Sequence, residues 1–209
     1  MMKVGITGGI GSGKSTVCRL FEQRGIAVYD SDREAKRLMT EEATLRTRIA
    51  GRFGAEAYAE GQLNRSYLAS RVFTDPEALA DLNALVHPAV LSDFAAWAER
   101  QPGPYVVLES AILFEAGLEH AVDRTVAVLA PLELRLSRPC RRDGCDEEAV
   151  RRRMAAQLAD APPRDRADSP VVHILETALA PAVADLARRH PPESPHRRRS
   201  GTPRPPRGR

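Results

Sequence analysis

Eight consecutive residues near the start of the chain have the types and spacing that bind nucleotide phosphates. Residues 8–15, GGIGSGKS, match the pattern G-x-x-x-x-G-K-[ST] between an apolar run and a helical segment. Glycines let backbone N–H groups point at a phosphate, and the following helix offers the positive end of its dipole. We therefore expect a phosphate-binding loop (P-loop) for a nucleoside triphosphate. The contacts are expected from Gly9, Ile10, Gly11, Ser12, Gly13, Lys14, Ser15 and Thr16.

Lys14 and Ser15 have separate expected roles in the P-loop. The ammonium group of Lys14 should contact the β- and γ-phosphates, which makes it a catalytic candidate, and the Ser15 hydroxyl should bind Mg²⁺. The loop alone does not name the reaction. A GTPase needs an Asn-Lys-x-Asp motif, which the chain lacks. A mechanical ATPase usually has an acid at a strand end, and Glu109 is an ambiguous match to that requirement.

Two carboxylates follow the second predicted strand, at residues 26–29. Asp30 and Asp32 lie at its carboxyl end, the edge where parallel α/β sheets bind ligands. A carboxylate there can accept the proton of an attacking hydroxyl group, as a phosphotransferase requires. Either acid can instead cap the helix that follows. We predict that Asp32 is the base and that Asp30 is the cap.

The apolar runs predict an α/β fold with a parallel sheet core flanked by helices. Strands are predicted at residues 3–7, 26–29, 105–109, 125–129 and 171–175, and the first helix at residues 14–24. The first two strands, with the glycine loop and helix between them, form a βαβ unit, which implies parallel strands. Residues 32–101 are almost wholly helical in pattern and too long for a simple crossover. This segment should form an excursion that covers part of the molecule.

Capping residues and prolines predict where the helices begin and end. The expected N-caps are Thr40, Asp75 and Asp146. Gly54 is expected to end the helix that begins at Thr40. Because proline removes a helical hydrogen bond, we expect a break at His87-Pro88 and a kink or break at Pro139.

The basic charge of the chain is concentrated in residues 191–209. This tail holds six arginines and one acid, whereas the rest of the chain has 25 basic and 27 acidic residues. The tail has almost nothing apolar to bury and is expected to be disordered, and the slightly acidic body disfavours a nucleic-acid partner. No apolar run is long enough to cross a membrane. Cys18, Cys140 and Cys145 lack zinc-site spacing, so we expect reduced thiols in a cytoplasmic protein.

Five segments in series resemble the dephospho-CoA kinases. They are residues 5–16 (GITGGIGSGKST), 28–32 (VYDSD), 85–88 (LVHP), 112–115 (ILFE) and 142–157 (RDGCDEEAVRRRMAAQ). The first segment is common to many P-loop kinases, and the other four in this order are far more specific. The resemblance implies an α/β P-loop kinase that uses ATP and Mg²⁺ to phosphorylate the ribose 3′-hydroxyl of dephospho-CoA, the last step of coenzyme A synthesis.

The resemblance also implies how the chain is divided. One P-loop kinase domain covers residues 1–190, followed by the tail. Its parts are a core (residues 1–31, 103–132 and 165–190), a helical substrate-binding insertion (32–102) and a mobile lid (133–164). The implied partners are dephospho-CoA and ATP, for a monomer or small homo-oligomer.

The resemblance implies roles for individual residues as well. Asp32 is the base and binds the substrate, together with Lys36, His87 and Phe114. Three arginines precede the capped lid helix, Arg138, Arg141 and Arg142, and guanidinium suits a transferring phosphoryl group because it can bind through two hydrogen bonds. Arg138 and Arg142 are taken as the catalytic candidates. Plainer alternatives are a polar edge residue for His87, a core residue for Phe114 and a solvated basic face for the arginines.

Two other functions stay open on the sequence alone. One is a kinase of another small alcohol or of a nucleoside monophosphate, which would share the P-loop and the lid. The other is a non-catalytic nucleotide-binding adaptor whose basic tail contacts a partner. The chain also departs from the usual family pattern, with Lys36 in place of arginine and Ala111 in place of proline.

Overall fold

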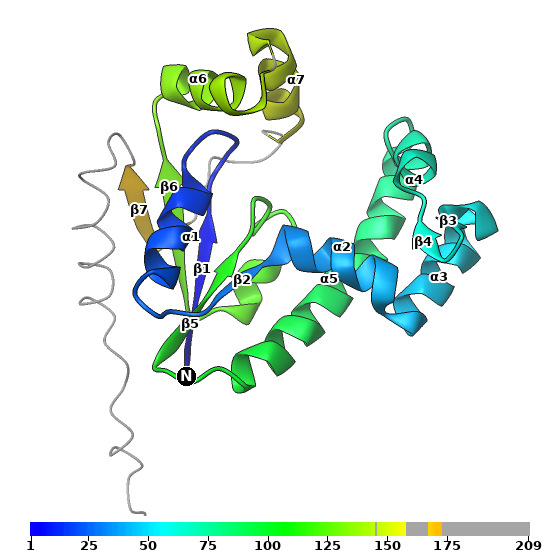
Figure 1. Cartoon of the computed structure of the whole chain (residues 1–209), viewed down its shortest axis with the longest axis horizontal. Coiled ribbons are helices and arrows are strands. Elements are labelled where there is room, and N and C mark those ends of the chain that lie inside the picture. The colour runs from blue at the N-terminus through cyan, green and yellow to red at the C-terminus, as the bar shows by residue number, and fades with distance from the viewer. Residues whose placement is uncertain (145, 158–166, 173–209) are drawn as a thin grey trace, which may run out of the picture.

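A five-stranded sheet forms the centre of the molecule, and all its strand pairs are parallel (Figure 1). The computed structural model describes residues 1–144, 146–157 and 167–172. The strands lie in the order β2-β5-β1-β6-β7, which confirms the predicted α/β fold. They are β1 (Met2–Thr7), β2 (Val28–Asp30), β5 (Tyr105–Glu109), β6 (Arg124–Leu129) and β7 (Ser169–Val172).

Strand β5 is an interior strand of the sheet, and its side chains are buried on both faces. All five of its residues are buried. Val107 packs in one hydrophobic cluster with Val17 of helix α1 (Lys14–Glu22), and Val106 packs in another with Phe94 of helix α5 (Pro76–Glu99). Alternate residues of a strand face opposite sides, so α1 and α5 cover opposite faces. Asp30 of β2 and Ile6 of β1 both pair with Glu109, so the three strands end together at the P-loop edge.

The insertion is mostly helical, as expected, but it also contains a small hairpin that the sequence did not predict. Its elements are α2 (Ser31–Glu41), α3 (Ala43–Phe53), a 3₁₀ turn (Ala55–Ala57), β3 (Tyr58–Ala59), β4 (Gln62–Leu63), α4 (Arg65–Val72) and α5. The Thr40 cap was wrong, because Thr40 lies within α2 and the Glu42 side chain caps α3. Gly54 ends α3 and Asp75 caps α5, as predicted.

Two prolines lie within continuous helices, so the predicted break at His87-Pro88 was wrong. Helix α5 runs through Pro88, and α6 (Leu132–Asp143) runs through Pro139. An interior proline costs a helix about 3 kcal/mol. In α5 this cost is offset by burial of Val86, Val90 and Phe94, since each buried side chain contributes roughly 1.5–3 kcal/mol.

Helices α6 and α7 (Glu147–Gln157) lie beside the P-loop, at the top of Figure 1, where the lid was expected. Asp146 begins α7 as predicted, because its Oδ1 accepts a hydrogen bond of 2.6 Å from the Ala149 N–H. A small apolar cluster joins the two helices to the P-loop. It comprises Leu136, Val150 and Met154, with Ile10 and Cys140 packed against them.

Strand β7 confirms the last predicted strand as far as Val172, although it begins earlier, at Ser169. Residues 173–175, the rest of the expected core to residue 190 and the tail 191–209 lie outside the described residues. Among the helices that are described, none has the length and apolar composition to cross a membrane.

Candidate active site

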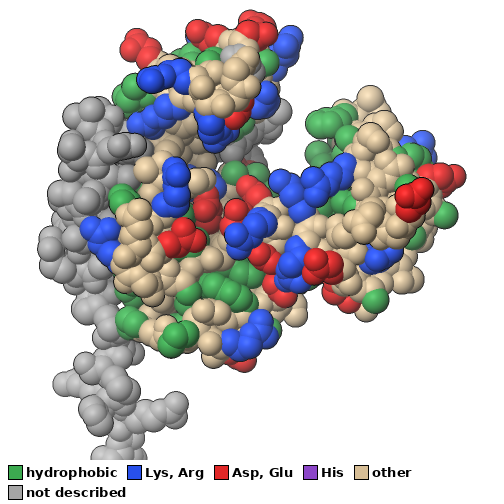
Figure 2. Space-filling model, viewed as in Figure 1, with side chains coloured by type: hydrophobic (Ala, Val, Ile, Leu, Met, Phe, Trp, Pro, Cys, Tyr) green, Lys and Arg blue, Asp and Glu red, His purple; other side chains and the backbone are tan. Residues whose placement is uncertain are grey.

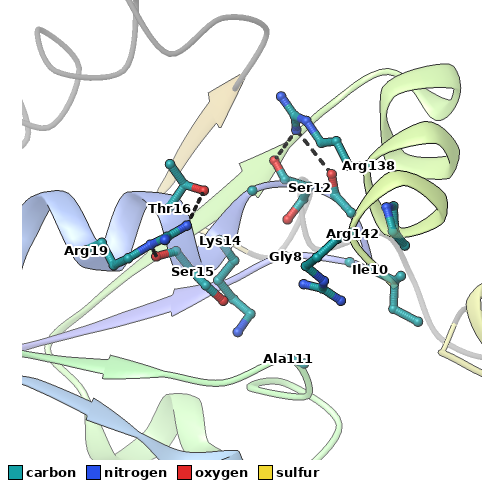
Figure 3. A pocket seen from close by; sticks show the side chains of 14 residues that line it. Gly8, Ile10, Ser12, Lys14, Ser15, Thr16, Arg19, Ala111, Arg138 and Arg142 are labelled. Atoms are coloured by element: carbon teal, nitrogen blue, oxygen red, sulfur yellow. Dashed lines mark hydrogen bonds between the residues drawn. The ribbon is translucent and has the colours of Figure 1, made fainter. Parts of the chain in front are cut away.

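The P-loop wraps around a cavity of about 390 Å³, which Figure 3 shows from close by. All eight predicted P-loop residues, Gly9 to Thr16, line it. Gly11 and Gly13 have φ angles of 73° and 95°, which favour glycine and let the backbone turn sharply before α1. The remaining lining residues are Gly8, Arg19, Ala111, Arg138, Pro139 and Arg142. The cavity therefore has the backbone cradle and the helix N-terminus that suit a triphosphate.

Glu109 is the main site residue that sequence reasoning left unassigned. Its Oε1 accepts hydrogen bonds from Lys14 Nζ at 2.6 Å and from Ser15 Oγ at 2.8 Å, and the residue is 7% exposed. Burial by itself would raise the pKa of Glu109, but the charge of Lys14 and the hydrogen bonds from Lys14 and Ser15 lower it below its ordinary value. Glu109 is thus an ionised carboxylate in contact with both P-loop side chains. Its position at the end of β5 was the available sequence signal.

Asp30 and Asp32 have different surroundings. Asp30 Oδ1 accepts hydrogen bonds from the N–H groups of Asp32 (3.1 Å) and Arg33 (3.0 Å), so Asp30 caps α2 as expected. Asp32 is exposed to solvent, yet the protein around it displaces enough water to raise the pKa of its carboxyl group. The positive charge of Lys14 opposes this rise. This effect of the Lys14 charge on the Asp32 pKa indicates that the Asp32 carboxylate lies near the P-loop.

A second cavity, of about 180 Å³, lies between α2, α5 and the segment after β5. Asp32 and His87 both line it, which brings these two predicted substrate residues together. Burial lowers the pKa of His87, so its ring is neutral at neutral pH. Ala111 lines the P-loop cavity while its neighbours Ser110 and Ile112 line the second one. Consecutive residues at the carboxyl end of β5 therefore line the two cavities, which both lie beside this short segment.

Arg138 and Arg142, the two lid arginines predicted to be catalytic, lie beside the P-loop in this structure. Arg138 Nη1 donates hydrogen bonds to the carbonyl oxygens of Gly11 (3.1 Å) and Ser12 (3.0 Å). Arg142 lines the cavity and also binds the neighbouring carboxylate of Asp143, at 2.7 and 2.9 Å. Both arginines thus lie beside the cavity. Arg138 binds the loop itself rather than standing free as a solvated basic face.

Comparison with known proteins decides the family. The family model described as "Dephospho-CoA kinase" matches residues 2–176. A dephospho-CoA kinase from Salinibacter ruber is 46% identical over 180 residues, which cover 84% of this chain and 88% of that protein. The chain belongs to the dephospho-CoA kinase family.

Solved structures agree with this family assignment in fold. A crystal structure of a protein from Thermus thermophilus is 37% identical to this dephospho-CoA kinase family member, with a TM-score of 0.77, and the match covers 90% of this chain and 97% of that one. A shikimate kinase from Acinetobacter baumannii has a TM-score of 0.53 at 18% identity, covering 90% and 92%. That likeness concerns the fold alone, so the acceptor must be argued from the cavity.

Two residues that the dephospho-CoA kinase resemblance assigned to the substrate do not line the second cavity. Phe114 is 8% exposed and packs in the hydrophobic core, which is its plainer alternative. Lys36 is exposed on α2, one helical turn after Asp32, and its charge opposes the rise in the pKa of Asp32. Asn83 does line the cavity, one turn before His87 on α5, although sequence reasoning did not single it out.

Proposed function

We propose that this chain transfers the γ-phosphoryl group of ATP to the ribose 3′-hydroxyl of dephospho-CoA, which gives coenzyme A and ADP. One structural observation supports the proposal in addition to family membership. A carboxylate, Asp32, lines a cavity that lies beside the same segment at the end of β5 as the P-loop cavity does. This is where a base must lie to act on a hydroxyl group that faces the γ-phosphate. The reduced thiols of Cys18 and Cys140 suit a cytoplasmic enzyme.

The charges around the second cavity favour an alcohol over a nucleoside monophosphate as acceptor. Among the described residues that line it, Asp32 is charged and none is lysine or arginine. The phosphate group of a nucleoside monophosphate would lose its hydrating water next to the Asp32 carboxylate and find no positively charged side chain in the cavity lining to pair with. Binding it there is therefore unfavourable. A neutral hydroxyl group meets no such penalty. The apolar lining, which includes Met39, Leu82 and Val86, further suits an uncharged part of a substrate.

In the proposed reaction, the P-loop N–H groups and the Lys14 ammonium hold the phosphates while Asp32 accepts the proton of the 3′-hydroxyl. The 3′-oxygen forms a bond to the γ-phosphorus as the bond between that phosphorus and the β–γ bridging oxygen breaks, and ADP leaves. The raised pKa of Asp32 makes it a stronger base than an ordinary aspartate. Arg138 and Arg142 lie on the lid side, where guanidinium groups can stabilise the transferring phosphoryl group.

The residues at the P-loop fit a magnesium ion. Ser15 and Glu109 place a hydroxyl and a carboxylate oxygen together, and Mg²⁺ prefers such oxygen ligands. Among the described residues no group of three or more candidate ligand side chains exists, so phosphate and water oxygens would complete the coordination. When bound, the ion neutralises charge on the phosphates. Ser15 would hold it and Glu109 would orient Ser15.

Glu109→Gln tests this role for Glu109. Glutamine keeps the shape but removes the charge, so the free Mg²⁺ concentration for half-maximal activity is expected to rise by about tenfold or more, a typical effect of altering groups around a metal site. Initial rates across a magnesium titration at saturating ATP would measure it. An unchanged half-saturation point would assign Glu109 to holding Lys14 alone.

A panel of acceptors with MgATP tests the function itself. Dephospho-CoA is expected to be phosphorylated with a higher kcat/KM than any nucleoside monophosphate or shikimate, because the second cavity lacks a cation for a charged acceptor group. Product formation would be followed by mass spectrometry, with a 3′-deoxy acceptor as the control that lacks the reacting hydroxyl. Faster turnover of a nucleoside monophosphate, or of the 3′-deoxy compound, would contradict the proposal.

A further inference from the structure

Arg135 of α6 contacts the P-loop through both its side chain and its backbone. Its Nε donates a hydrogen bond of 3.1 Å to the carbonyl oxygen of Ile10, which lies 125 residues earlier in the chain. Burial lowers the pKa of the Arg135 guanidinium. Arg135 does not line the P-loop cavity, unlike Arg138 on the next turn. It therefore binds the loop from outside the phosphate site.

The planar peptide bond links this outer contact to the inner face of the loop. In a trans peptide, the carbonyl of one residue and the N–H of the next point in opposite directions. A hydrogen bond from Arg135 to the Ile10 carbonyl therefore directs the Gly11 N–H away from the lid helix, toward the side where a phosphate would bind. Arg138 of the same helix also binds the loop, at the Gly11 and Ser12 carbonyls, but it lines the phosphate cavity. Because the loop has few side chains of its own, the outer contact from Arg135 can set its conformation.

The glycines of the loop leave room for Arg135 as well as for phosphates. A Cβ atom on Gly9 would lie 2.5 Å from Arg135 Nη2, and the nearest atoms it would meet are all from the Arg135 guanidinium. A Cβ atom on Gly11 would lie 2.0 Å from the backbone oxygen of Arg135. Both positions thus face α6 on the side where a side chain would project. Because glycine has no side chain, Gly9 and Gly11 let helix α6 pack directly on the loop.

We propose that Arg135 is a positioning residue of the nucleotide site, which holds the P-loop amide groups in the orientation that binds the β- and γ-phosphates of ATP. The guanidinium binds the Ile10 carbonyl and packs over Gly9, and it touches neither phosphate nor acceptor. The inference rests on the proposed function only in taking ATP as the ligand. Its effect should therefore appear in nucleotide binding without any acceptor.

Equilibrium binding of MgATP to the full chain, measured calorimetrically without acceptor, tests the proposal. Arg135→Ala is expected to weaken binding by about tenfold or more, because a lost charge-assisted hydrogen bond costs at least the free energy that corresponds to that factor. Arg135→Lys, which can still donate to the Ile10 carbonyl, should recover part of the loss. Arg152→Ala is the matched control, since it removes an exposed arginine from the same lid. The KM for dephospho-CoA should stay unchanged.

A double-mutant cycle with Gly9→Ala separates positioning from general lid stability. Gly9→Ala alone should weaken MgATP binding, because the new methyl group displaces the Arg135 guanidinium. In the Arg135→Ala background the same change should have little further effect, so the two losses are not additive. The proposal would be overturned if the two losses of MgATP affinity were additive. It would also be overturned if Arg135→Ala bound MgATP as tightly as the Arg152→Ala control. Because binding needs no acceptor, failure to phosphorylate dephospho-CoA would count against the proposed function and leave this result intact.

Discussion

Asp32→Asn is expected to lower kcat by about a hundredfold or more, since general base catalysis contributes roughly 10²–10⁴ in rate. Asparagine keeps the shape of the side chain but cannot take the proton of the acceptor hydroxyl. The melting temperature should not fall, because Asp30 and not Asp32 caps α2. It can rise slightly, since the surroundings of Asp32 disfavour its charged form, as its raised pKa indicates. Steady-state kinetics and thermal unfolding together measure both effects.

Asp30→Asn is the matched control for this experiment. Asparagine caps a helix about as well as aspartate, so turnover should stay near that of the wild type. If Asp32→Asn reduced kcat by no more than the control does, the acceptor hydroxyl would be activated by another group. A loose phosphoryl-transfer transition state needs little proton abstraction, so the size of the effect also measures how far the proton has moved.

The pH dependence of kcat/KM provides an independent test of whether Asp32 acts as the base. The base acts only when ionised, so activity should fall as the pH drops through the pKa of Asp32. Because that pKa is raised, the fall should begin at a higher pH than the ordinary aspartate value of about 3.9 predicts. The residual activity of Asp32→Asn should lack this acid limb. An identical limb in both proteins would assign it to another group.

Lys14→Ala is expected to reduce kcat by about 10²–10³, the range found when a preorganised donor to a developing charge is removed. The structure adds a second consequence, because Lys14 also neutralises Glu109. The two side chains form an ion pair at 2.6 Å and are 13% and 9% exposed. Breaking a buried pair by removing one partner typically destabilises a protein by about 3–5 kcal/mol. The single variant is therefore expected to be both much less active and less stable.

The double variant Lys14→Ala, Glu109→Gln separates these two consequences. Without a buried unpaired charge it should unfold closer to the wild-type temperature, yet its kcat should stay as low as that of Lys14→Ala because the ammonium is absent. Thermal unfolding and single-turnover assays on the three proteins would show this. Recovery of activity in the double variant, or a Lys14→Ala protein within about threefold of wild-type kcat, would contradict a catalytic role for Lys14.

The sequence by itself determined the P-loop, the parallel sheet and the Asp30 cap, and it led to the prediction that Asp32 is the base. These are features whose physical cause is local. Glycine spacing allows the loop backbone, alternating and continuous apolar runs produce the strands, and a short polar side chain before a helix caps it. The family resemblance added the substrate, because its motifs occur in a fixed order along the chain.

Only the tertiary structure decided which distant groups meet at the site. Glu109 binds Lys14 across 95 residues, and Arg135 binds the Ile10 carbonyl across 125. Pro88 stays within a helix because its neighbours are buried, and Phe114 packs in the core and does not line the second cavity. Burial and pairing depend on how the elements pack, and no residue type or spacing encodes that alone. Packing also brought Asp32 and His87 together around one cavity beside the P-loop.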